Sequence, residues 1–197
     1  MTNHREKHPI IVVISGPSGV GKDAIITRMK KRGENFHFTV TATTRAKRPA
    51  EQKNKDYIFL STNEFNEIIR KNGFLEYAQV YGNYYGVPKD QVDRALSENK
   101  DVLIKIDVQG AKTIKNTLRN TLFIFLSPPN FPELERRLKD RMTEDSNSLR
   151  KRLATAKNEM KESVWFDHIV INNRDQIDLA VDEITSLLMK ARNRLSS

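Results

Sequence analysis

Residues 10–23 read IIVVISGPSGVGKD, and this stretch decides the fold class. Its first part, residues 10–15, is a continuous run of mostly β-branched residues, which predicts a buried strand. Residues 16–22 then match the G-x-x-x-x-G-K pattern of a phosphate-binding loop. Residues 22–31 follow with apolar side chains at helical spacing. A strand, a glycine-rich loop and a helix in this order predict a phosphate-binding α/β core.

The chemistry of the loop favours a polyphosphate ligand. Glycines let the backbone N–H groups approach phosphate oxygens closely, the helix N-terminus adds partial positive charge, and Lys22 adds a full one. One position departs from the pattern, because Asp23 stands where a Ser or Thr hydroxyl normally ligates Mg²⁺. A carboxylate can bind Mg²⁺ directly or through water, so Asp23 is the candidate metal residue. Its negative charge beside the nucleotide phosphates calls for a compensating cation.

The rest of the chain alternates strands with helices, which is typical of a parallel sheet covered on both faces. Further strands are expected at residues 101–107, 121–126 and 168–171, and helices at residues 132–141, 149–161 and 176–194. Residues 38–88 break the alternation. Strands at 37–44 and 55–60, a helix at 61–71 with a Ser61-x-x-Glu64 capping box, and an aromatic-rich stretch at 74–85 predict a small mixed insert. The polar stretch 143–148 predicts a mobile loop.

Composition excludes several classes of protein. The chain has 197 residues, 38% hydrophobic, with no cysteine and a net charge of +9. Disulfide scaffolds, thiolate metal sites and cysteine nucleophiles are therefore excluded, and no apolar run approaches the ~20 residues of a membrane span. The charge excess indicates either a basic surface or an anionic partner. We expect no nucleic-acid partner, because no recognised nucleic-acid-binding pattern is present.

Seven segments resemble the guanylate kinases, which belong to the nucleoside monophosphate kinases. They are GPSGVGK (16–22), TATTRAKRP (41–49), KDYIF (55–59), LEYAQVYGNYYG (75–86), IDVQG (106–110), RRLKDR (136–141) and VIN (170–172). The resemblance implies a P-loop NTPase-type parallel core at 9–37, 89–142 and 154–197, a mixed α/β GMP-binding insert at 38–88 and a short lid at 143–153. The Gly-Lys-Asp loop is similar to that of organellar and some bacterial members.

The resemblance also implies roles for individual residues. The implied ATP-binding residues are Gly16, Pro17, Ser18, Gly19, Val20, Gly21, Lys22, Asp23 and, beside the adenine, Asn172. The implied GMP-binding residues are Thr41, Arg45, Arg48, Tyr57, Glu76, Tyr85 and Asp107. The implied catalytic residues are Lys22, Arg45, Arg137, Arg141 and Arg152. Taken singly, Glu76 reads as a solvated strand residue and Arg137 as part of a polar helix face, and only the joint spacing favours a site.

Physical chemistry agrees with these roles. Two guanidinium groups and two phenolic hydroxyls can surround a phosphate dianion with charge-assisted hydrogen bonds. A glutamate can accept two parallel bonds from guanine N1–H and its 2-amino group, a pair that adenine does not offer. The implied reaction is reversible, Mg²⁺-dependent phosphoryl transfer from ATP to GMP or dGMP. Two alternatives stay open: a kinase for another phosphorylated acceptor such as ribose 1,5-bisphosphate, and an inactive domain of this type that binds phosphopeptides.

Two further departures from the family pattern have structural consequences. Lys105 stands where many relatives carry an acidic residue, and Val87 stands where they commonly carry Ser or Thr near the guanine. Asp23 follows the loop and Lys105 ends a neighbouring strand, so we expect them to form an ion pair with less than about 6 Å between their charged atoms. We expect a monomer or homodimer without a membrane partner, in the cytoplasm or, after removal of a transit peptide, in an organelle matrix.

Overall fold

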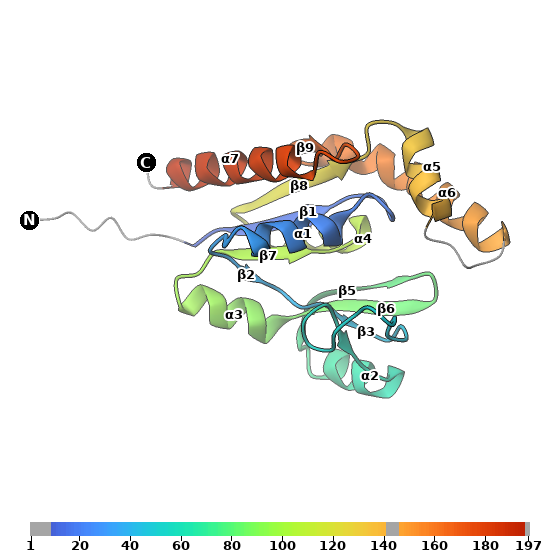
Figure 1. Cartoon of the computed structure of the whole chain (residues 1–197). Helices are drawn as coiled ribbons and strands as arrows, with labels where there is room; N and C mark the ends of the chain where they lie inside the picture. The colour runs from blue at the N-terminus through green and yellow to red at the C-terminus, as the bar shows by residue number, and fades with distance from the viewer. Residues whose placement is uncertain (1–8, 141–145, 196–197) are drawn as a thin grey trace, which may run out of the picture.

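The computed structural model describes residues 9–140 and 146–195, and its centre is a parallel sheet (Figure 1). In the described part of the chain this sheet has five strands in the order β2-β7-β1-β8-β9. Their bounds are β1 Ile11–Ser15, β2 His37–Phe38, β7 Val102–Lys105, β8 Thr121–Ser127 and β9 His168–Ile171. Each neighbouring pair is parallel, as the alternation of strands and helices predicted.

Helices cover both faces of this sheet. The helices are α1 Lys22–Lys31, α3 Lys89–Ser97, α4 Val108–Thr117, α5 Phe131–Asp140, α6 Ser146–Lys161 and α7 Ile177–Leu195, and the 3-10 helix η1 is Glu162–Trp165. Because side chains alternate along a strand, Val12 and Ile14 of β1 face one layer while Ile11 and Val13 face the other. The first layer contains α1, α5, α6 and α7, and the second contains α3, α4 and η1.

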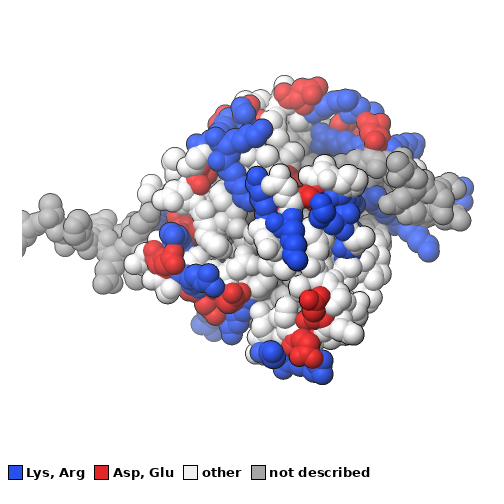
Figure 2. All heavy atoms as spheres, turned by 60° about the horizontal axis from the view of Figure 1, so that its bottom comes forward, with Lys and Arg blue, Asp and Glu red and all other residues white. Residues whose placement is uncertain are grey.

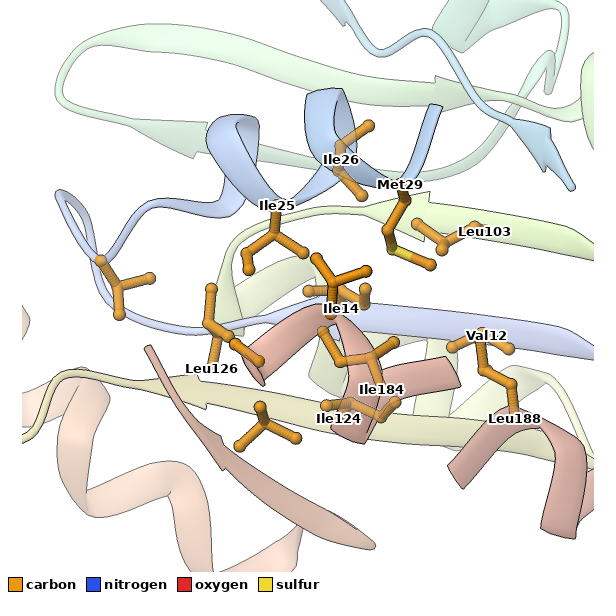
Figure 3. Close-up of a cluster of buried hydrophobic side chains, with 14 of the residues drawn as sticks. Val12, Ile14, Ile25, Ile26, Met29, Leu103, Ile124, Leu126, Ile184 and Leu188 are labelled. Atoms are coloured by element: carbon orange, nitrogen blue, oxygen red, sulfur yellow. The ribbon is translucent and has the colours of Figure 1, made fainter. Parts of the chain in front are cut away.

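The first layer is the larger core (Figure 3). Ile25 and Met29 of α1 meet Ile184 of α7 over β1, and Ile25, Met29 and Ile184 are all fully buried. Truncating such a residue to alanine typically costs about 2–5 kcal/mol. This packing fixes the start of α1, and with it the phosphate loop, against the carboxyl ends of the strands.

The insert forms its own mixed sheet, in the order β4-β3-β6-β5, with α2 Thr62–Arg70 packed on it. Its strands are β3 Ala42–Thr43, β4 Ile58–Phe59, β5 Phe74–Val80 and β6 Asn83–Pro88. Phe65 of α2 lies at its centre, stacked on Phe74 with ring centroids 4.4 Å apart. The predicted capping box is confirmed, because Ser61 and Glu64 exchange side chain–backbone hydrogen bonds.

Several expectations on the elements need correction. The strand predicted at 37–44 is two strands in different sheets, because β2 pairs with β7 and β3 pairs with β4 and β6. The strand predicted at 55–60 shrinks to Ile58–Phe59, since Asn54 takes a positive φ and starts a turn. The sequence analysis missed α3 and α4. Of the predicted loop 143–148, residues 143–145 lie outside the described residues, and residues 146–148 belong to α6, since Ser and Asn are favoured at helix starts.

Among the described residues, no helix has both the length and the apolar character that a membrane crossing requires.

Candidate active site

A cleft of about 780 Å³ lies where the phosphate loop, the insert, the end of β7 and α6 meet. Six basic and four acidic side chains line it, so its walls carry an excess of positive charge; Figure 2 shows Lys and Arg side chains gathered toward the middle of one face of the molecule. The cleft brings together most of the residues that the sequence analysis selected. They are Pro17, Ser18, Gly19, Val20, Gly21, Lys22, Asp23, Thr41, Arg45, Arg48, Tyr57, Glu76, Tyr85, Asp107 and Arg152.

The phosphate loop needs its glycines for two reasons. Gly16 and Gly21 both have a positive φ, which L side chains rarely adopt. A Cβ on Gly16 would lie 2.2 Å from the carbonyl oxygen of Leu126, and a Cβ on Gly21 would lie 2.5 Å from the amide nitrogen of Asn172. The loop is therefore pressed against β8 and the chain after β9, which fixes its backbone.

Arg137 and Asn172 hold the loop from behind and do not line the cleft. The guanidinium of Arg137 donates to the carbonyl oxygens of Val20 (3.0 Å) and Asn172 (2.9 Å). The Asn172 amide also donates to Val20 O at 2.8 Å. Glu133, one turn before Arg137, accepts a bond from its Nε at 2.8 Å. In this structure both residues thus stabilise the loop backbone. Gly16 is not among the residues that line the cleft. Arg141 lies outside the described residues.

Lys22 and Glu159 line the cleft beside the phosphate loop. The Lys22 ammonium donates to the carbonyl oxygens of Gly16 (2.5 Å) and Pro17 (3.2 Å). Burial lowers the pKa of Lys22, although nearby carboxylates, first Glu159, act in the opposite sense. Burial raises the pKa of Glu159, which accepts a bond from the Ser18 N–H at 3.2 Å, and Lys22 opposes that shift.

Glu159 is a residue that sequence reasoning missed. A signal existed, because Glu159 follows Arg152 by seven residues, which is two helical turns and places both on one face of α6. Arg152 donates to the Ser18 hydroxyl at 3.2 Å and lies over the ring of Tyr81, with 5.9 Å between Cζ and the centroid. Tyr81, which was also missed, brings the β5–β6 hairpin against α6 on the far side of the cleft.

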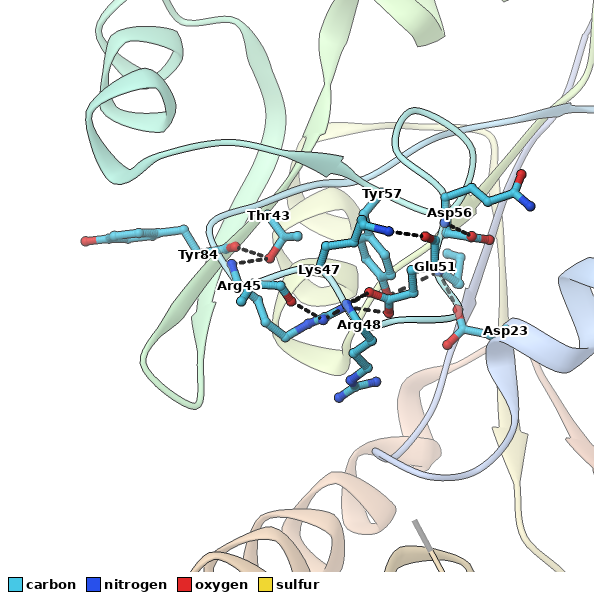
Figure 4. A network of polar contacts seen from close by, with 12 residues as sticks. Asp23, Thr43, Arg45, Lys47, Arg48, Glu51, Asp56, Tyr57 and Tyr84 are labelled. Atoms are coloured by element: carbon cyan, nitrogen blue, oxygen red, sulfur yellow. Dashed lines mark hydrogen bonds and ion pairs between the residues drawn. The ribbon is translucent and has the colours of Figure 1, made fainter. Parts of the chain in front are cut away.

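On the insert side of the cleft, a carboxylate holds the two insert arginines (Figure 4). Both oxygens of Glu51 accept from the Arg45 guanidinium, at 2.7 and 3.1 Å, and one also accepts from the Arg48 backbone N–H at 2.8 Å. Burial disfavours the charged form of each partner, but their mutual hydrogen bonds outweigh it, raising the pKa of Arg45 and lowering that of Glu51. Tyr57 lies beside Arg45, with 5.3 Å from Cζ to the ring centroid. Sequence reasoning missed Glu51, which follows Arg48 by three residues.

Glu76 is a buried carboxyl aimed at the cleft. It is 4% exposed, and its Oε2 has no hydrogen-bond partner among the described residues. Burial, with a smaller contribution from Asp107, raises the pKa of Glu76 to about 8. Asp107 caps α4 by accepting from the Gly110 N–H at 2.9 Å. An isolated polar group of this kind is costly unless a ligand satisfies it.

The expected ion pair between Asp23 and Lys105 is confirmed. The Lys105 ammonium lies 2.5 Å from Asp23 Oδ1 and 3.3 Å from the Tyr57 hydroxyl. Thr41, predicted near the guanine, donates to the backbone oxygen of Lys105 at 3.3 Å. Val87 is fully buried in the second core layer and is not among the cleft residues.

The acidic side chains of the cleft fit a metal ion that a phosphate-bearing ligand would largely hold. Among the described residues, no group of three or more His, Cys, Asp or Glu could hold a metal ion. Asp23 offers a carboxylate that is 60% exposed at the mouth of the loop. Mg²⁺ in phosphoryl-transfer sites typically binds one or two carboxylates, several waters and the substrate phosphates. Asp23 therefore fits this role, and no dedicated protein cage is needed.

Comparison with known proteins agrees with this arrangement. The guanylate kinase family model matches residues 8–191. "Guanylate kinase 2, chloroplastic/mitochondrial" of Oryza sativa subsp. japonica is 44% identical over 91% of this chain, which spans 64% of the rice protein. The guanylate kinase of Clostridium tetani is 41% identical over 94% of this chain and 88% of its own length. The crystal structure of guanylate kinase from Anaplasma phagocytophilum has a TM-score of 0.77 at 29% identity, covering 95% of this chain and 88% of its own. The chain belongs to the guanylate kinase family.

Proposed function

We propose that this guanylate kinase transfers the terminal phosphoryl group of ATP to GMP inside the cleft, giving ADP and GDP. One observation carries the proposal: a single cleft contains both the phosphate loop with Lys22 and the buried, unpartnered carboxyl of Glu76. The loop suits a polyphosphate, and the carboxyl suits a base that presents two neighbouring N–H donors.

Glu76 is the proposed reader of the guanine. In its ionised form it accepts from N1–H and the 2-amino group, which satisfies both carboxylate oxygens. Adenine presents an acceptor at N1 and would leave the carboxylate unpaired in a buried site, which carries a large penalty. Thr41 is proposed to contact the same base, on the side of its O6.

The acceptor phosphate is proposed to bind between Arg45, Arg48, Tyr57 and Tyr85. Glu51 supports this assignment, because its carboxylate already engages Arg45 in the two-pronged manner expected of a phosphate. Glu51 keeps the guanidinium oriented, and an incoming phosphate shares that guanidinium or takes it over. Asp107 is proposed to lie beside the reacting phosphates.

The donor is proposed to bind along residues 16–22, with Lys22 and the loop N–H groups on its phosphates. Arg152, and with it Arg141, is proposed to stabilise the transferring group. Bound Mg²⁺ would neutralise phosphate charge, with Asp23 holding it directly or through water. The adenine is proposed to lie beside Asn172, next to a shallow hollow that includes Asn173 and Arg174. Arg137 is proposed as a positioning residue that holds the loop backbone.

The acceptor oxygen of GMP is already anionic, so the reaction needs no strong general base and no covalent intermediate. Catalysis rests on holding the two phosphates in line and on stabilising charge as the phosphoryl group moves between them. The insert and the lid must close to exclude water, because water would otherwise compete as the acceptor.

The decisive experiment measures ADP release from Mg-ATP with GMP, dGMP, AMP, UMP or ribose 1,5-bisphosphate offered separately. Turnover with GMP and dGMP alone supports the proposal. Turnover only with ribose 1,5-bisphosphate would favour the kinase of another acceptor. A folded protein without turnover on any acceptor would favour a phosphopeptide-binding module, which direct titration with a phosphoserine peptide then tests.

Compartment and assembly are proposals of the same kind. We propose the cytoplasm, or else an organelle matrix, as the place of action, since bacterial guanylate kinases and a rice protein named as chloroplastic/mitochondrial are similar to this chain. We propose a monomer or homodimer without nucleic acid or membrane partners. Fractionation of cells and sedimentation of the purified protein check these statements.

A further inference from the structure

Lys105 ends β7 at the point where the donor and acceptor sides of the cleft meet. Its ammonium touches two residues from different parts of the fold: Asp23 at the start of α1, at 2.5 Å, and the Tyr57 hydroxyl in the insert, at 3.3 Å. It also lies 4.4 Å from the centroid of the Tyr57 ring. An ammonium has three N–H donors, and the described residues supply two acceptors. One donor therefore remains for a ligand in the cleft.

The burial of the two partners shows which one depends on the other. The Asp23 side chain is 60% exposed, so water can solvate its charge without help. The Lys105 side chain is only 14% exposed, and a buried ammonium needs a counter-charge. Asp23 thus holds Lys105 more than Lys105 neutralises Asp23.

Contact with Lys105 also fixes the direction of the Tyr57 hydroxyl. A phenolic oxygen that accepts from an ammonium must send its own proton elsewhere. The Tyr57 ring lies beside Arg45 and 6.2 Å from the Tyr85 ring, so the groups assigned above to the acceptor phosphate surround it.

We propose that Lys105 is a phosphate-binding residue of the acceptor site. Asp23 holds Lys105 in place, and the Lys105 ammonium contacts the GMP phosphate and turns the Tyr57 hydroxyl toward that phosphate. The inference rests on the proposed function. Asp23, directly after the phosphate loop, thereby serves the acceptor substrate as well as the donor.

The test is a double-mutant cycle on binding, without metal and without turnover. Lys105→Met, Asp23→Asn and the double variant are titrated with GMP and, separately, with guanosine in EDTA. Losing a charge-assisted contact should weaken GMP binding about tenfold or more in Lys105→Met, and leave guanosine binding unchanged. Because Asp23 holds Lys105, Asp23→Asn alone should also weaken GMP binding, and Lys105→Met should cost less in the Asp23→Asn background than in the wild type. Lys105→Arg, which keeps the charge and the donors, should recover part of the affinity.

Two results overturn the inference. If Asp23→Asn binds GMP at least as tightly as the wild type, and the double variant binds as tightly as Asp23→Asn, Lys105 only neutralises Asp23. If Lys105→Met weakens GMP and guanosine equally, the residue only maintains the shape of the cleft. Wild-type turnover with GMP, measured alongside, separates this inference from the proposed function. An active wild type with an unaffected Lys105→Met overturns the role of Lys105 alone, whereas a wild type that does not bind GMP overturns both.

Discussion

The proposed donor side of the cleft, around the phosphate loop, is built mainly from backbone, whereas the proposed acceptor side, around the insert, is built from side chains. The loop at residues 16–22 is shaped by glycines and held from behind by Arg137 and Asn172. The acceptor side gathers Arg45, Tyr57 and Glu76 from separate segments of the insert. We therefore expect a backbone site to tolerate a changed side chain at its edge, such as Asp23, and a side-chain site to depend on every member. The predictions below, made on four single variants, test that difference from the largest expected effect to the smallest.

Lys22→Ala should cause the largest loss of activity, because Lys22 supplies a full positive charge at the phosphate loop. We expect kcat to fall at least about 100-fold, the order found when a single group that stabilises transition-state charge is removed. GMP affinity should stay near that of the wild type, since the acceptor side is untouched.

Steady-state kinetics with Mg-ATP and GMP, together with GMP titration, check this outcome. Lys31→Ala is the matched control, because Lys31 is exposed on the same helix and away from the cleft. A Lys22→Ala enzyme with near-normal turnover would contradict the proposed mechanism.

Glu76→Gln should lower GMP affinity about 10- to 100-fold, because the amide replaces one acceptor with a donor facing guanine.

The wild type should also show a pH effect that the variant lacks. With the pKa of Glu76 near 8 in the free protein, guanine binding must ionise the carboxyl and release a proton. Guanosine affinity should therefore rise from pH 6 to about pH 8 in the wild type and stay flat in Glu76→Gln.

The same carboxyl predicts a change in stability with the opposite trend. A folded-state pKa raised above the usual value of 4.5 means that the folded protein favours the protonated form. The stabilisation is complete below about pH 4.5 and is lost as the pH rises through about 8. Glu76→Gln should match the wild-type Tm at pH 5 and exceed it by several degrees at pH 9. Equal Tm differences at both pH values would show that Glu76 is ionised throughout.

How far each side of the cleft could be predicted from the sequence depends on how that side is built. The loop lies in one uninterrupted motif, so residues 16–23 were identified together. The Asp23–Lys105 pair was predictable because β7 runs beside β1 in parallel, which brings the end of one strand to the loop after the other. Glu159 was missed because its contact with Ser18 depends on how α6 crosses the loop, and no local pattern encodes that crossing.

Local propensity explains why the helix α4 was missed. Residues 108–117 read VQGAKTIKNT, and their glycine and β-branched residues are poor helix formers. The helix forms nevertheless, since Asp107 caps it and Val108, Ala111 and Ile114 pack into the core. The split of residues 37–44 into β2 and β3 could not be predicted either, because one extended stretch supplies a strand to each of two sheets.

Arg137→Ala should weaken ATP binding about tenfold, since it removes hydrogen bonds to Val20 O and Asn172 O behind the loop. A positioning residue should raise the KM for ATP and lower the Tm while the affinity for GMP is retained. Lys139→Ala is the matched control, because Lys139 also pairs with a glutamate of α5, Glu135, but is more exposed and lines neither the cleft nor the hollow. A loss confined to kcat, with unchanged Tm, would show instead that Arg137 reaches the ATP phosphates.

Gly110→Ala should produce the smallest effect, and it separates stability from activity. Alanine favours the α4 helix by up to about 1 kcal/mol, yet its Cβ would lie 2.4 Å from Glu76 Oε2. Because that contact is with the end of a side chain, we expect the helix to stay and the carboxyl to shift. The KM for GMP should rise several-fold while the KM for ATP is unchanged.

A double-mutant cycle with Glu76→Ala decides whether the displaced carboxyl is the cause. Without the Glu76 carboxyl, Gly110→Ala has nothing to displace and should leave the KM for GMP where Glu76→Ala alone puts it. Additive losses in the double variant would mean that Gly110 acts through the backbone of α4. The acceptor side would then share the backbone construction of the donor side, and the contrast between the two halves of the cleft would disappear.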